Sequence, residues 1–160
     1  MDILPTPMTE LTVTARTGRA HTEHVREHLR RCLALLGDTG ESALTDLSVA
    51  LVDDDAMSQL HARFSGDPTP TDVLTFELDH DADDRCTGGE VVVCVPQAER
   101  TAAERGTDVA DELLLYALHG TLHLCGFDDQ TPADFDRMHQ REDELLTAIG
   151  VGPVFVGSAV

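Results

Sequence analysis

The sequence predicts an α+β fold, with about four strands in one mixed sheet and helices packed on it. Short segments rich in valine and leucine, such as 46–52 and 89–95, are typical of buried strands. Residues 108–125 are apolar nearly all round, which predicts a central buried helix. With 160 residues, 41% of them hydrophobic, the chain can bury a sizeable core. We therefore expect a single domain over 1–160, with a loose tail over 150–160.

The first third of the chain alternates strand and helix patterns. Alternating residues predict a short strand over 11–15, and valine and leucine at helical spacing predict a helix over about 22–36. A strand is expected over 46–52. Asp53 is a suitable N-cap for a short helix that runs through Phe64.

The middle of the chain predicts a pair of strands. A buried strand is expected over 73–78, and the acidic stretch 79–84 is expected to be a solvated loop. The next strand, over 89–95, should end at Pro96, because proline cannot donate to a sheet. Residues 97–105 follow as a polar helix or turn.

A last helix closes the predicted fold. Thr131 is a good N-cap, and Pro132 suits the first helical position because its fixed φ is already helical. Helical spacing assigns five apolar residues to its core stripe: Phe135, Met138, Leu145, Leu146 and Ile149.

Two histidines near the end of the central helix carry the chemistry. His119 and His123 are four residues apart, so both imidazoles lie on one helix face. Gly126 can take the left-handed conformation that ends a helix, and the turn would bring Asp129 to the pair. Two His nitrogens and one Asp oxygen would form a three-ligand site with room for water, which is typical of catalytic zinc. The alternative to a metal site is that one histidine lies on the helix surface and the other in the core. Cys125 could also be a ligand, but its apolar surroundings favour a place in the core.

The charge of the chain limits its partners. The formal net charge is −19 and all eleven basic residues are arginine, which argues against broad nucleic-acid affinity. One segment differs, because Arg16–Arg31 holds five arginines against two acids. We expect Arg26 and Arg30 in this segment to form a positive rim of the site; the alternative is a solvated helix face. No signal peptide or membrane span is visible, so a cytoplasmic protein without membrane contact is expected.

Three segments resemble one known family. The sequence HGTLHLCGFDD, residues 119–129, resembles the HGxLHLxGYDH signature of the YbeY family, bacterial metal-dependent endoribonucleases of rRNA maturation. Residues 70–76, PTDVLTF, are similar to that family's PTDVLSF strand, and residues 89–93, GEVVV, to its GDIxI strand.

The resemblance implies a zinc-dependent single-strand endoribonuclease that acts on small-subunit rRNA, with the ribosomal small subunit and its proteins as partners. His119 and His123 match two catalytic, metal-binding histidines of the family signature. Asp129 stands where the third histidine is usual, which should weaken the metal as a Lewis acid and shift preference toward harder ions such as Mn²⁺. One ion per chain is expected. Asp128 matches the family's aspartate and is expected to lie in the second shell or cap the turn.

A further departure concerns substrate contacts. The family carries an arginine where this sequence has Ser65, and Arg63 lies two residues earlier. Either Arg63 substitutes for it or is an exposed helix residue. Thr71 and Asp72 could line the cleft, although Asp72 could equally cap a turn.

Two other functions remain open. The chain could be a ribosome-assembly factor whose metal is structural, in which case four protein ligands should close the site. It could also be another zinc hydrolase, such as a peptidase. Related peptidases place a glutamate base after the first histidine, where this sequence has Gly120, which argues against that function.

Overall fold

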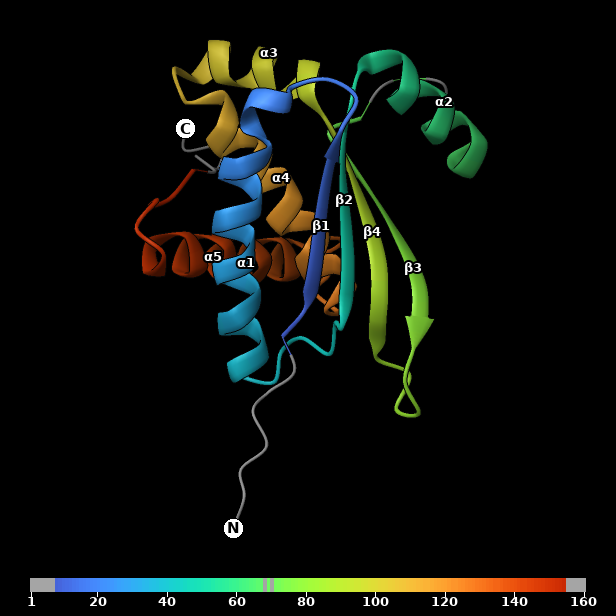
Figure 1. The fold of residues 1–160 in the computed structure, drawn as a ribbon, viewed down its shortest axis with the longest axis vertical. Coiled ribbons are helices and arrows are strands. Elements are labelled where there is room, and N and C mark those ends of the chain that lie inside the picture. Colours follow the sequence, from blue (N-terminus) through green and yellow to red (C-terminus); the bar gives the residue numbers. More distant parts are fainter. Residues whose placement is uncertain (1–7, 68, 70, 155–160) are drawn as a thin grey trace.

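One four-stranded mixed sheet organises the computed structural model, which describes residues 8–67, 69 and 71–154 (Figure 1). The strands are β1 (Glu10–Ala15), β2 (Asp46–Val52), β3 (Val73–His80) and β4 (Cys86–Cys94). Their order is β1-β2-β4-β3; β1, β2 and β4 are parallel, and β3 is antiparallel to β4. The predicted α+β class is confirmed.

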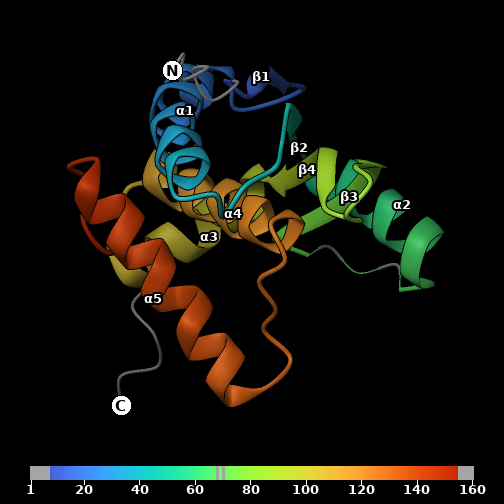
Figure 2. The ribbon, with the colours of Figure 1, turned by 90° about the horizontal axis from the view of Figure 1, so that it is seen from below.

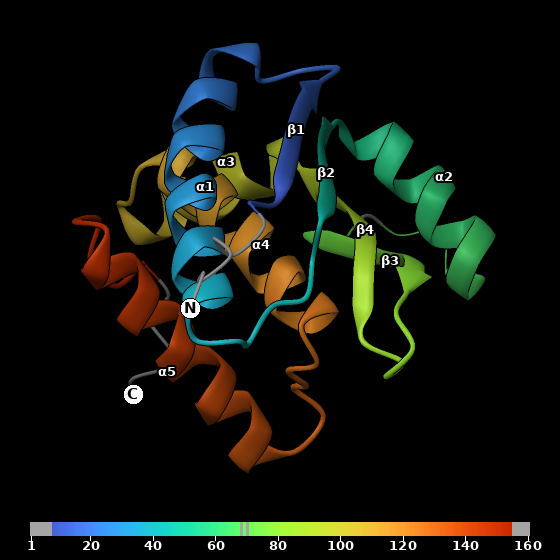
Figure 3. The ribbon, with the colours of Figure 1, turned by 60° about the horizontal axis from the view of Figure 1, so that its bottom comes forward.

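Five α-helices in the described residues cover this sheet unequally. They are α1 (Thr22–Asp38), α2 (Asp54–Ser65), α3 (Val95–Arg105), α4 (Val109–Leu124) and α5 (Pro132–Ala148), with a short 3₁₀ helix at Arg19–His21 before α1. Figure 2 shows α4 in the middle, between the sheet and the surrounding helices α1, α3 and α5. Only α2 lies on the other side of the sheet (Figure 3).

The central position of α4 follows from its residues. Four leucines of α4 are fully buried: Leu113, Leu114, Leu118 and Leu122. Apolar side chains of this helix therefore pack both against the sheet and against the neighbouring helices. Gly120 allows the close approach to the sheet: a Cβ there would lie 2.6 Å from Cγ1 of Val91. The backbone of α4 is therefore held against β3 and β4 at the level of the two histidines.

Polar side chains begin three of the helices, as their sequences suggest. The carboxylate of Asp53 accepts a hydrogen bond from the amide of Ala56 (2.8 Å), and Thr131 Oγ1 accepts one from the amide of Asp134 (3.1 Å). Both predicted N-caps are confirmed. Asp108 caps α4 in the same way.

The hairpin between β3 and β4 is longer than predicted. We expected a loop over 79–84, but β3 continues to His80, which pairs with Cys86 across an irregular register. Backbone pairing with β4 extends the strand despite its acidic residues. At the other end, β4 stops at Cys94 rather than at Pro96, because Pro96 occupies the first turn of α3, where its missing N–H is tolerated.

The C-terminal region differs in part from what the sequence predicted. At the start of the tail that we expected to be loose, the amides of Val151 and Gly152 both donate to the carbonyl of Leu146, and Val154 is buried; residues 155–160 lie outside the described part. Phe135 is 40% exposed instead of in the core, because the first turn of α5 extends beyond the surface that α4 covers. None of the described helices is long and apolar enough to span a bilayer.

Candidate metal centre

The end of α4 forms a turn that returns the chain to the two histidines. Gly126 has a φ of 101°, in the left-handed region, and the amide of Phe127 donates back to the carbonyl of Leu122 (3.0 Å). Asp128 stabilises the same turn, since its Oδ1 accepts from the amides of Asp129 and Gln130. The turn brings the Asp129 side chain over the histidine pair.

Three ligand atoms then form a nearly equilateral triangle. His119 Nε2 lies 3.2 Å from His123 Nε2, and Asp129 Oδ2 lies 3.4 Å from the first and 3.5 Å from the second. Ligands bound at about 2.0–2.1 Å to a tetrahedral zinc ion are roughly 3.3–3.4 Å apart. The triangle therefore fits one face of a zinc coordination tetrahedron, and these residues form a candidate metal site.

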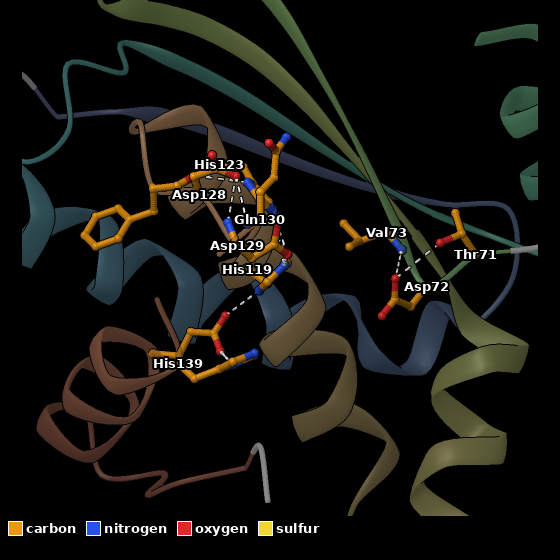
Figure 4. A network of polar contacts seen from close by, with 11 residues as sticks. Thr71, Asp72, Val73, His119, His123, Asp128, Asp129, Gln130 and His139 are labelled. Atoms are coloured by element: carbon orange, nitrogen blue, oxygen red, sulfur yellow. Dashed lines mark hydrogen bonds and ion pairs between the residues drawn. The ribbon is translucent and has the colours of Figure 1, made fainter. Parts of the chain in front are cut away.

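The other ring nitrogen of each histidine, Nδ1, makes a hydrogen bond within the protein. His119 Nδ1 donates to Glu142 Oε2 at 2.7 Å, and His123 Nδ1 donates to the carbonyl of Phe127 at 3.1 Å (Figure 4). In the neutral rings, both Nε2 atoms therefore carry lone pairs. Two lone pairs and a carboxylate oxygen facing one another at these distances repel unless a cation or a proton lies between them.

Glu142 holds His119 from inside the protein. Its carboxylate is fully buried and accepts a second hydrogen bond from His139 Nδ1 (2.5 Å). Burial alone would raise the pKa of Glu142, but the hydrogen bonds from His119 and His139 outweigh it and hold that pKa below its ordinary value. Burial alone would lower the pKa of His119; Glu142 and the charge of Asp129 outweigh it and raise that pKa.

Glu142 and His139 did not emerge from the sequence as functional residues. One sequence signal could have indicated Glu142. It is a charged residue on the same helical stripe as Met138 and Leu145, which pack into the core. Cys125, considered as an alternative ligand, is outside the metal cluster, and burial raises the pKa of its thiol to about 11.

The residues proposed for substrate binding lie in different places. Arg63, on the last turn of α2, lines a hollow of about 830 Å³ at the β3 edge of the sheet, and His123 lines the same hollow. The Ser65 hydroxyl donates to the carbonyl of His61 in its own helix. Asp72 accepts from the amide of Val73 and from Thr71 Oγ1, and it lies across from the cluster (Figure 4).

The arginine-rich segment is not brought to the cluster. Arg26 bonds to Glu23 and to the carbonyl of Val13, and Arg30 bonds to Glu27. Arg30 lines a separate hollow between α1 and the start of the sheet, which contains none of the three ligands.

Comparisons with known proteins agree with this fold and show the family. The sequence model of the family described as Endoribonuclease YbeY matches residues 11–150. The chain is 36% identical over 138 residues to an endoribonuclease YbeY of Symbiobacterium thermophilum, covering 82% of this chain and 88% of the relative. It is 35% identical to that of Moorella thermoacetica, covering 77% and 83%.

A solved structure shares the fold as well. The solution structure of TM1509 from Thermotoga maritima matches with a TM-score of 0.59 and 28% identity, covering 87% of this chain and 91% of that one. Together, the sheet, the buried helix and the three-ligand cluster define a candidate metal-dependent enzyme. The chain belongs to the YbeY family of endoribonucleases.

We predict that Glu142→Gln lowers the affinity for zinc about 10- to 100-fold, the usual effect of losing the carboxylate behind a histidine ligand. The amide can present an N–H to His119 Nδ1 and favour the tautomer whose Nε2 lone pair is lost. Zinc titration against a competing chelator measures the affinity, and Glu144→Gln on the exposed side of α5 is the matched control. Equal affinities in the two variants would contradict a role for Glu142 in orienting His119.

Proposed function

We propose that this chain hydrolyses single-stranded RNA at one metal ion, zinc in the first place, held by His119, His123 and Asp129. The observation that carries the proposal is the convergence of three acceptor atoms, two of them on imidazole rings that hydrogen bonds at Nδ1 hold in place. The family supplies the reaction class, because its members are endoribonucleases.

Each residue of the cluster has a distinct part in this proposal. The two Nε2 atoms and Asp129 Oδ2 bind the ion, and Glu142 keeps the proton of His119 on Nδ1. A zinc ion at such a site polarises a phosphoryl oxygen and lowers the pKa of a bound water. Asp129 brings a negative charge where histidine is usual, which makes the site more tolerant of Mn²⁺.

The number of ligands favours an enzyme over an assembly factor with a structural metal. Structural zinc is closed by four protein ligands, whereas catalytic zinc keeps a position for water or substrate. In the ranges that the structure describes, the cluster at the end of α4 has three members. A peptidase is disfavoured by Gly120, because Val91 leaves no space there for a glutamate base.

The hollow at the β3 edge suits a single RNA strand. Arg63 offers a cation to phosphate, although Glu77 and Glu90 also line the hollow. Phe64 is 61% exposed beside Phe76, with ring centroids 4.7 Å apart. Proteins that bind single-stranded nucleic acid without sequence preference commonly stack the bases on exposed aromatic rings beside cationic side chains. His123 at the end of this hollow would bring such a strand to the metal.

The cellular role that we propose rests on the family. The RNA is small-subunit rRNA during maturation and quality control, the partners are the ribosomal small subunit and its proteins, and the reaction takes place in the cytoplasm. Guidance by ribosomal partners also suits a chain of net charge −19.

We predict that metal content and RNA cleavage are lost together. Protein treated with a chelator should not cut a single-stranded RNA, and adding back zinc or manganese should restore cutting. His119→Ala should contain no stoichiometric metal by elemental analysis and should not be restored. A variant with its full metal content, or chelated protein that still cuts RNA, would refute this assignment.

We also predict that Asp129→His keeps the metal and becomes more selective for zinc over manganese. The exchange replaces an oxygen ligand by nitrogen and removes one charge. Competition titrations with both ions measure the ratio. Asp128→His is the comparison, since Asp128 caps the turn instead of facing the histidines. Loss of all metal in Asp129→His alone would mean that position 129 cannot accept an imidazole.

A third prediction separates the two arginine regions. Arg63→Gln should weaken RNA binding several-fold and lower the slope of log K against log salt by about 0.7, the value for one phosphate contact on a single strand. Arg26→Gln combined with Arg30→Gln should change both quantities less, because these arginines already bond to glutamates. A larger effect of the double variant would instead assign RNA guidance to the arginine-rich segment.

A further inference from the structure

The metal cluster lies between two hollows, and the second one is unexplained by the proposal above. His119 and Asp129 line a cavity of about 390 Å³ between α3, α4 and α5, with Asp72 at the start of β3. His123 lines the β3-edge hollow instead. An RNA strand that passes the metal site from the β3-edge hollow would reach this separate cavity on the other side. Its volume is typical of small-ligand sites.

The wall from α4 contains a buried carboxyl without a full set of partners. Glu112 lies one and two turns before Tyr116 and His119, so all three share a helix face that opens on the cavity. Glu112 is fully buried; its Oε1 accepts from Thr107 Oγ1 at 2.8 Å, but its Oε2 has no hydrogen-bond partner within the described part of the chain. A buried polar atom left unpaired is costly, which indicates a group that binds there.

The opposite wall, from α3, is polar as well. Gln97, Thr101 and Arg105 recur every four residues along it. The Tyr116 hydroxyl donates to Thr101 Oγ1 at 3.0 Å, and Gln97 Nε2 donates to the same oxygen at 3.4 Å. Three helix faces that normally bury apolar side chains thus direct hydrogen-bonding groups into one cavity.

The third wall, from α5, adds aromatic surface. Phe135 is 40% exposed, and its ring meets His139 edge to face with centroids 4.3 Å apart. His139 in turn stacks on His119 at 5.7 Å. An exposed phenyl ring beside a polar cavity is a platform on which a flat aromatic ligand can stack.

The charge of the cavity selects the class of ligand. Asp72, Glu112, Asp129 and Glu142 line it against a single arginine, Arg105, so a phosphate is disfavoured. A neutral nucleobase matches it better: every base has a face for stacking, N–H donors for a carboxyl oxygen, and acceptors for a guanidinium.

We propose that the α3–α4–α5 cavity binds the nucleobase of the nucleotide next to the scissile phosphate. The base stacks on Phe135, donates an N–H to Glu112 Oε2 and accepts from Arg105, while its phosphate stays at the metal. This inference rests on the proposed RNA hydrolysis and adds to it a subsite that can select one base over another.

The test compares nucleotides with a probe that lacks a base. GMP, AMP, CMP, UMP and ribose 5-phosphate are titrated into zinc-loaded protein by calorimetry. At least one nucleotide should bind tenfold or more tightly than ribose 5-phosphate. Phe135→Leu and Glu112→Gln should each reduce this advantage about tenfold without changing the binding of ribose 5-phosphate, and Glu104→Gln, on the exposed face of α3, should leave it intact.

The outcomes separate this inference from the proposed function. Equal binding of all five probes, or a base advantage that survives Phe135→Leu, overturns the base subsite while phosphate binding at the metal stands. No binding of ribose 5-phosphate, with a base advantage still present, supports the subsite and counts against phosphate binding at the metal. If Glu112→Gln does not fold, Phe135→Leu alone decides, because that side chain is partly exposed and can be shortened without opening the core.

Discussion

The hydrogen bond between the Glu142 carboxylate and His119 Nδ1 is the interaction on which the site depends. A buried carboxylate is stable only when it is well paired, and here two histidines pair it. His139 belongs to α5 itself, but His119 is on α4, so its bond to Glu142 forms only when α5 is docked on α4. Docking of the last helix, orientation of the His119 ring and the capacity to bind a cation are therefore one coupled arrangement.

The charge of the chain limits how RNA could bind at the proposed site. With a net charge of −19, most of the surface repels RNA, and attraction is confined to a few arginines. The two hollows beside the cluster differ: the β3 edge offers Arg63 and the exposed ring of Phe64, while the α3–α4–α5 cavity has four carboxyl groups against one arginine. Under the two proposals, phosphates and bases would lie on different sides of one ion, and stacking and hydrogen bonding, more than charge, would hold the strand.

Asp129 would change the charge at a bound metal as well as the ligand atom. In the family signature that this chain resembles, a neutral histidine takes that place. In the proposed site, one carboxylate would bind the ion directly and a second, Glu142, would act through His119. Both would stabilise a bound dication, but the direct one would also reduce its power to ionise water, so such a site would combine firm metal binding with a more modest Lewis acid.

The sequence alone predicted the three side chains that converge at the end of α4, because each is placed by local geometry. The helical period puts His119 and His123 on one face, and the left-handed Gly126 returns Asp129 to them within a few residues. The turn also separates the two neighbouring aspartates, because Asp129 faces the histidines whereas Asp128 accepts hydrogen bonds from amides of the turn itself. The strands, the long helices and the caps at Asp53 and Thr131 follow from similarly local patterns.

Only the tertiary structure decided what surrounds those ligands. Glu142 lies 23 residues from His119 along the chain, and nothing local tells a buried, paired glutamate from an exposed one. Whether Phe135 enters the core, whether Arg26 and Arg30 face the site, and which helix faces enclose the cavity depend on how α3, α4 and α5 pack together. Helix periodicity fixes which side chains share a face, whereas the burial of apolar surface by the whole chain fixes what that face meets.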